Sequence, residues 1–175
     1  MCIARSSVQL GVKRQTDMTS QVEKFATVAA QFCEWAEGGS LSQEREAQIA
    51  HQFLCDLCQL ALQLPPEFGE EEPAEITYET WHSIYCRFGS LPFNYYSHCF
   101  DPQEVPNDAT TADLADDLAD IWRDLKGGLS LFRSGHVQAA VWEWRQSYWQ
   151  HWGRHAAGGI YALHCWLAEH RDVVA

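Results

Sequence analysis

The chain has 175 residues, 46% of them hydrophobic, so it can bury one sizeable core and is too short to predict two. Its formal net charge of −12 argues against nucleic acid as a partner, because such binding depends on neutralising phosphates with Lys and Arg. The same charge argues against anionic membrane surfaces, and no apolar run is long enough to span a bilayer. A cation or a basic partner is compatible with this composition.

The cysteine pattern predicts a cytoplasmic protein with reduced thiols. Seven cysteines is an odd number, and their spacings form no recognisable disulfide framework. The first residues, MCIARSSVQLGVKRQ, lack the apolar run of a signal peptide. Cys55 and Cys58 have C-x-x-C spacing but fall within a helical pattern without a second pair, which favours packing over a zinc or redox site.

In chain order, residues 1–17 show no helical period and are predicted to be a disordered extension, with Met18 as an alternative start. Residues 18–175 are predicted to form one helical domain. Ser20 and Glu23 fit a capping box, and the helical period that follows continues to Gly38-Gly39.

Three further segments lead to the C-terminal half. A helix is predicted from about Ser42 to Leu64, where Pro65-Pro66 ends it, and the acidic loop PPEFGEEEPAE follows. A short helix is predicted over residues 78–88. Residues 89–106 are rich in aromatics without a clean period, which indicates an ordered irregular connection.

Two amphipathic helices complete the pattern. The first starts near Asp113 and ends near Gly127-Gly128 or slightly later, before a turn at Ser134-Gly135. The second runs from His136 to about Glu169, either continuous or kinked at one of its glycines. The predicted fold is therefore an all-α, single-domain antiparallel bundle of about five main helices.

The C-terminal helices place polar groups beside apolar faces. Asp113, Asp117, Asp120 and Asp124 recur at i, i+4, i+7 and i+11 and form one row. Arg145 lies within a wide apolar arc, so we predict that it is buried and ion-paired with Asp124 or Asp120. Tryptophans at helical spacing are typical of a core, although eight of them leave some to line a groove. The residues predicted to bind a partner here are Asp117, Asp120, Asp124, Trp144, Arg145, Tyr148 and Trp152.

His151 and His155 lie one helical turn apart, a spacing at which two imidazoles can chelate one divalent cation. The H-E-x-x-H pattern of metalloproteases is absent. If the two C-terminal helices are antiparallel, Asp113 and Asp117 come level with these imidazoles. The predicted metal ligands are therefore Asp113, Asp117, His151 and His155, which would suit Zn, Mn or Fe. The alternative is a pair of carboxylate–imidazole hydrogen bonds that hold the helices together.

Three motifs carry a resemblance to a known family. The stretches DLADDLADIWRDLKGGLSLFRSG and AVWEWRQSYWQHWGRHAAGGIYALH resemble the C-terminal part of a bacterial family named domain of unknown function 5063, and RFGSLPFNYYSHCFDP resembles its middle motif. The resemblance covers the chain from Arg87 onward and implies a small bacterial helical protein without an assigned activity. The residues that line up with the family's pattern are Asp113, Asp117, Asp120, Asp124, Trp144, Arg145, His151, Trp152 and His155.

Three functions are compatible with these residues. The first is a non-enzymatic binding or adaptor module whose aromatic groove and acidic face dock a protein or a small molecule. The second is a divalent-metal-binding protein or metal-dependent enzyme with an Asp/His site between the two C-terminal helices. The third is a small-molecule pocket closed by residues 93–100 over the tryptophans. An exposed aromatic patch favours the first, and converging carboxylates and imidazoles favour the second.

Overall fold

The computed structural model describes the backbone of residues 3–99 and 101–170, and side chains from residue 19 onward. Its elements are α1 (Ile3–Glu37), α2 (Gln43–Ala61), α3 (Tyr78–Arg87), the 3-10 turn η1 (Phe88–Ser90), β1 (Tyr95–His98), β2 (Thr110–Asp113), α4 (Leu114–Arg133), α5 (Val137–Ser147), the π-helical segment η2 (Tyr148–Trp152) and α6 (Gly153–Glu169). Because α5, η2 and α6 follow one another without a break, the described residues form about five main helices, which confirms the predicted all-α bundle.

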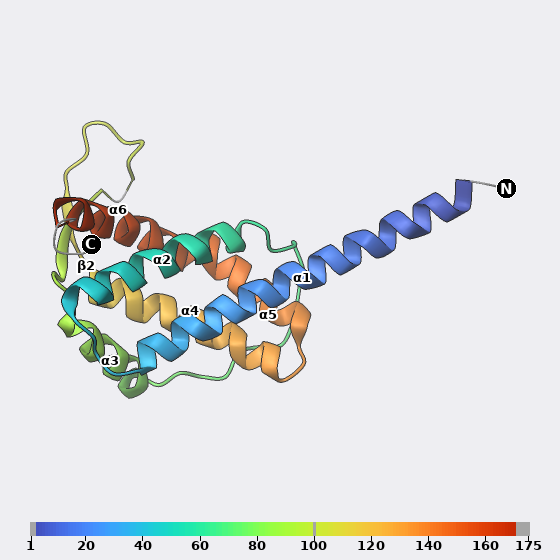
Figure 1. Cartoon of the computed structure of the whole chain (residues 1–175), viewed down its shortest axis with the longest axis horizontal. Coiled ribbons are helices and arrows are strands. Elements are labelled where there is room, and N and C mark those ends of the chain that lie inside the picture. The colour runs from blue at the N-terminus through green and yellow to red at the C-terminus, as the bar shows by residue number, and fades with distance from the viewer. Residues whose placement is uncertain (1–2, 100, 171–175) are drawn as a thin grey trace.

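Helix α4 occupies the middle of the bundle (Figure 1). It contacts α1, α3, α5 and α6, while α2 packs against α1 and α6. The fully buried side chains come from every long helix and include Phe25, Phe32, Leu54, Leu57, Leu118, Ile121, Leu125, Trp144 and Trp152. No described helix is long and apolar enough to cross a lipid bilayer.

Local chemistry sets most helix ends where the sequence predicts them. The side chains of Ser42, Thr77 and Asp113 accept hydrogen bonds from backbone N–H groups in the first turns of α2, α3 and α4. Gly135, at φ 86°, makes the turn between α4 and α5, a conformation that favours glycine. The acidic segment of residues 65–75 is a loop, as predicted.

Helix α1 begins at Ile3, so the predicted capping box at Ser20 and Glu23 is wrong and these residues lie inside the helix. The first part of α1 projects beyond the bundle (Figure 1). Side chains that pack into the core begin with Val22 and Phe25. The backbone of residues 3–17 is helical, whereas the disorder expected for residues 1–17 stays a prediction.

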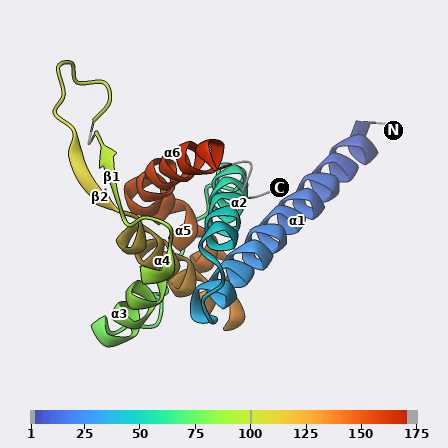
Figure 2. The same cartoon turned by 60° about the vertical axis from the view of Figure 1, so that its left-hand side comes forward.

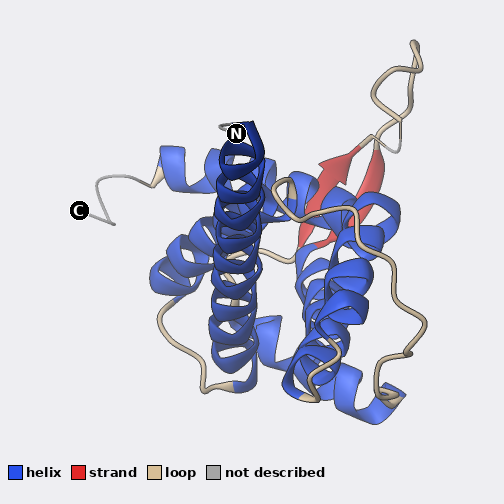
Figure 3. Ribbon diagram, turned by 90° about the vertical axis from the view of Figure 1, so that its right-hand side faces the viewer, coloured by secondary structure: helices blue, strands red, loops and turns tan. Residues whose placement is uncertain are grey.

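The aromatic connection contributes β1, which pairs with β2 in a single antiparallel hairpin at the edge of the molecule (Figures 2 and 3). Tyr95 pairs with Asp113 and His98 with Thr110. Because β2 leads directly into α4, the hairpin places β1 beside the start of that helix. Leu114 N–H donates to Asn94 O at 2.7 Å, which ties the hairpin to α4.

Helices α4 and α5 approach closely because an indole occupies the space of a missing side chain. A Cβ atom at Gly128 would lie 2.1 Å from Trp144 Nε1. The indole N–H donates to Leu125 O at 3.1 Å, so its only polar atom is satisfied inside the core. Trp152 is equally buried and donates to Trp144 O. The expected groove role of Trp144 and Trp152 is therefore wrong, because both rings are fully enclosed by the bundle.

A buried ion pair joins α2 to α3. Glu46 is fully buried, and its Oε1 lies 3.0 Å from Arg87 Nη2 while its Oε2 accepts from Trp35 Nε1 at 2.9 Å. Arg87 also donates to Trp35 O, and its guanidinium lies 4.9 Å from the ring centres of Trp35 and Phe88. The pair thus holds the α1–α2 turn against the end of α3.

Glu46→Ala should lower the free energy of unfolding by about 3–5 kcal/mol, because Arg87 would stay buried without its carboxylate. Urea denaturation monitored by circular dichroism measures the change. Glu44→Ala, in the same first turn of α2, is the control and should remain within about 0.5 kcal/mol of the parent. Equal midpoints for Glu46→Ala and Glu44→Ala would contradict a stabilising role for the pair.

Candidate functional site

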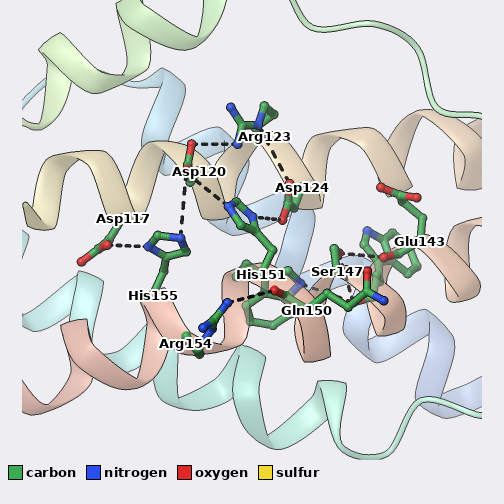
Figure 4. Close-up of polar contacts among 12 residues, drawn as sticks. Asp117, Asp120, Arg123, Asp124, Glu143, Ser147, Gln150, His151, Arg154 and His155 are labelled. Atoms are coloured by element: carbon green, nitrogen blue, oxygen red, sulfur yellow. Dashed lines mark hydrogen bonds and ion pairs between the residues drawn. The ribbon is translucent and has the colours of Figure 1, made fainter. Parts of the chain in front are cut away.

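Five side chains converge between α4 and the last helix (Figure 4). Asp117, Asp120 and Asp124 project from α4, where their i, i+3 and i+7 spacing places them on one face. His151 projects from η2 and His155 from α6. The imidazole rings lie edge to face with centroids 4.8 Å apart.

The π-helical turn sets the direction of the imidazoles. Gly153 N–H donates to Tyr148 O, the i to i−5 bond that defines this turn. A Cβ atom at Gly153 would lie 2.3 Å from Tyr148 O, so a larger residue cannot occupy this position without moving the backbone. The helix therefore continues through its glycines without a break, and the irregularity at Gly153 is a widened turn.

Each imidazole is fixed through Nδ1 by its own carboxylate. His151 Nδ1 lies 2.8 Å from Asp124 Oδ2, and His155 Nδ1 lies 2.6 Å from Asp117 Oδ1. Since an ionised carboxylate only accepts hydrogen bonds, Nδ1 carries the proton in both rings. The hydrogen bond to Asp117 raises the pKa of His155, against the opposing effect of burial. Burial raises the pKa of Asp124, while its bond to His151 opposes the rise.

The second nitrogens of both rings face Asp120. Its Oδ2 lies 3.5 Å from His151 Nε2 and 3.9 Å from His155 Nε2. One ligand atom from each of the three residues lies within 4.8 Å of the others, close enough for all three to bind one cation. Among the described residues, Asp120, His151 and His155 form the group of His, Cys, Asp and Glu side chains whose ligand atoms lie this close together.

The other oxygen of Asp120 is already occupied. Trp81 Nε1 donates to Oδ1 at 2.9 Å from α3, and Arg123 Nη2 lies 2.9 Å from the same atom. Asp117 has a similar outer partner, since Tyr96 on β1 donates to its Oδ2 at 2.6 Å. Burial and this bond raise the pKa of Tyr96. Hydrogen bonds from α3 and β1 thus fix the positions of Asp120 and Asp117.

Charge and exposure suit a cation. The cluster has three carboxylates and one guanidinium, so with neutral imidazoles two negative charges are uncompensated. The side chains of His151 and His155 are 37% and 27% exposed, whereas that of Asp120 is 13% exposed. Water and ions can therefore reach the imidazoles, while the carboxylate is mostly shielded and its attraction is less screened.

The structure assembles only part of the predicted metal set. Asp117, His151 and His155 lie together as predicted, but Asp113 caps α4 and accepts from Tyr85 Oη at 3.2 Å, so its predicted role as a ligand is wrong. Asp120 takes its place at the centre. The prediction assumed two regular helices when it matched residues on one with residues on the other. The π turn and the turn at Gly135 shift the last helix relative to α4, so Asp120 and not Asp113 lies beside both imidazoles.

The predicted ion pair of Arg145 with Asp124 or Asp120 is also wrong. Arg145 is half-buried, and within the described part of the chain no carboxylate lies within ion-pair distance of it. Arg123, on the same helix as the acidic row, and His151 occupy those carboxylates instead. Of the other predicted binding residues, Tyr148 is half-buried and packs edge-on against Trp152.

Trp81, Tyr96 and Arg123 belong to the site but were not predicted from the sequence. Trp81 and Tyr96 reach it from α3 and β1, which requires the tertiary arrangement. Arg123 is the exception, because its i, i+3 spacing from Asp120 is visible in the sequence.

Two other candidates are the cysteine pair of α2 and the pocket expected over the tryptophans. Burial raises the pKa of the Cys58 thiol to about 11, which fits the packing role predicted for Cys55 and Cys58. Residues 93–97 border a hollow of about 330 Å³ beside Trp166, not beside the buried tryptophans of α5 and η2. The predicted pocket closed by residues 93–100 therefore stays a prediction, and Phe100, at its expected edge, lies outside the described residues.

The chain belongs to the family described as domain of unknown function (DUF5063), which matches residues 16–169 and so includes the whole site. This match confirms the resemblance inferred from the C-terminal motifs and extends it to the N-terminal helices. The fold is similar to the crystal structure of protein BF1032 from Bacteroides fragilis, with a TM-score of 0.67 and 25% identity over 82% of this chain and 90% of that chain. No curated protein matches the sequence.

Gly153→Ala should lower the free energy of unfolding by roughly 1–3 kcal/mol and displace both imidazoles, since the new methyl group requires the π turn to change. Chemical denaturation measures the first effect, and the imidazole resonances in NMR spectra measure the second. Gln150→Ala is the control, because its exposed side chain lies in the same segment. A Gly153→Ala protein with the parent's midpoint and imidazole resonances would refute this role for glycine.

Proposed function

We propose that this family member binds one divalent transition-metal ion through His151, His155 and Asp120. The observation that carries the proposal is that the two nitrogens of each imidazole have different partners. Nδ1 donates to a carboxylate, and Nε2 faces the shared oxygen of Asp120. Metal-binding histidines commonly donate their other ring N–H to a carboxylate, which fixes the tautomer and raises the basicity of the ligand nitrogen.

The ligand types favour Zn²⁺, Mn²⁺ or Fe²⁺. Imidazole nitrogens bind these ions well, whereas Mg²⁺ and Ca²⁺ prefer oxygen ligands alone. Two histidines and one carboxylate leave further coordination positions for water or substrate. A centre of this kind can polarise a substrate oxygen, lower the pKa of bound water or, with iron, react with oxygen. We therefore propose a metal-dependent enzyme as the class of function.

The competing functions have fewer structural observations in their support than the metal centre. A binding or adaptor module was expected to use Trp144 and Trp152, which are core residues. A purely structural clasp would need only the two carboxylate–imidazole pairs, and it leaves Oδ2 of Asp120 facing two ring nitrogens that carry no proton when the imidazoles are neutral. A cytoplasmic location is a further proposal, and it rests on the cysteine pattern of the sequence.

Calorimetric titration tests the metal centre directly. Tag-free protein stripped of metal should bind one Zn²⁺, Mn²⁺ or, without oxygen, Fe²⁺ per chain. Asp120→Asn and the double variant His151→Ala/His155→Ala should weaken binding by more than about 100-fold. Asp117→Asn and Asp124→Asn should weaken it by about 10–100-fold, as expected for partners of the ligands.

Two controls separate this ligand set from other acidic and imidazole groups. Asp113→Asn should bind metal like the parent, because Asn also caps helices well and Asp113 is not a proposed ligand. His164→Ala changes an exposed histidine on α6 outside the cluster and should also have no effect. If the parent binds no tighter than the double variant, the five side chains are a clasp between helices and the metal proposal is wrong.

A further inference from the structure

Asp120 is held by donors that leave one of its oxygens available to a metal ion. Trp81 Nε1 and Arg123 Nη2 both approach Oδ1 at 2.9 Å, and Oδ2 faces His151 and His155. On the basis of the metal centre proposed above, we infer that Trp81 is a positioning residue. Its hydrogen bond to Oδ1 leaves Asp120 to bind the metal ion through Oδ2 alone.

Trp81 is better suited to this task than Arg123. Its indole belongs to α3, a different helix from Asp120, and lies between Tyr78 and Tyr85 with ring centroids 5.7 Å away on each side. This ordered row of rings limits the directions in which the N–H can point. Arg123 lies on α4 itself, is 40% exposed and is shared with Asp124. A long exposed side chain loses more conformational entropy when it is fixed in place.

The constraint determines how many positions on the metal stay open. A carboxylate can bind a metal through one oxygen or through both, and the two-oxygen mode occupies an extra position. With Oδ1 engaged by the indole N–H, rotation of Asp120 into the two-oxygen mode would break a hydrogen bond between partly buried groups. Trp81 therefore favours a three-ligand centre with positions left for water and substrate, which metal-dependent catalysis requires.

Trp81→Phe removes the N–H and keeps an aromatic ring in the row. Cobalt(II) is the probe, because its visible absorption depends on coordination number and geometry. We expect Trp81→Phe to weaken Co²⁺ and Zn²⁺ binding by about 10–100-fold. At saturating Co²⁺ its absorption should also shift towards that of a higher coordination number, which a merely structural role would not produce. Trp166→Phe is the matched control, since this half-buried tryptophan packs on His170 away from the cluster.

The outcomes separate this inference from the proposed function. Parent and Trp166→Phe proteins that bind Co²⁺, with weaker binding and altered absorption in Trp81→Phe, support the positioning role. Parent-like affinity and absorption in Trp81→Phe overturn that role and leave the metal centre intact. Absence of binding in the parent overturns both. The urea midpoint of each metal-free variant is measured in parallel, and a loss of affinity that only follows a loss of folded protein also overturns the positioning role.

Discussion

The packing of Trp144 against Gly128 is the constraint on which the site depends. The indole fills the space of the absent side chain and satisfies its own N–H on Leu125 O, so α4 and α5 approach without a buried unpaired donor. This contact fixes the separation of the two helices about the turn at Gly135. Farther along the pair, the same separation allows carboxylates on α4 to reach imidazoles on the opposite helix.

The π turn then converts close packing into a particular geometry. A regular helix could place His151 and His155 on one face, but it would not settle which nitrogen meets which carboxylate. With the turn closed at Gly153, both Nδ1 atoms are paired and both Nε2 atoms face Asp120. Such turns are rare and occur often at functional sites, because a widened turn costs stability that regular helix would keep.

The sequence predicts those features that depend on local chemistry. The helix starts near Ser42 and Asp113 and the turn at Gly135 follow from local sequence, and the common level of Asp117 and His155 follows from helical spacing. Prediction from the sequence fails where several side chains from different parts of the chain could bind the same carboxylate. Arg145 was matched to the acidic row because periodicity cannot show that a nearer guanidinium and an imidazole already occupy it. The hydrogen bond of Trp81 to Asp120 depends on how α3 packs against α4, which the helical period of residues 78–88 does not show.

The charges around Asp120 favour a cation at this position. Neighbouring aspartates on one helix face repel one another. Burial raises the pKa of Asp116 beside them, and the repulsion from these aspartates adds to the rise. Two carboxylate–imidazole pairs already join the helices, and Trp81 and Arg123 occupy Oδ1 of the third carboxylate, Asp120. The placement of its Oδ2 between two Nε2 atoms that carry no proton when the imidazoles are neutral adds repulsion. It becomes favourable when positive charge lies among the three side chains, as two imidazole protons or as one divalent ion. Only the ion makes simultaneous use of both Nε2 lone pairs and of the Asp120 oxygen that Trp81 leaves open.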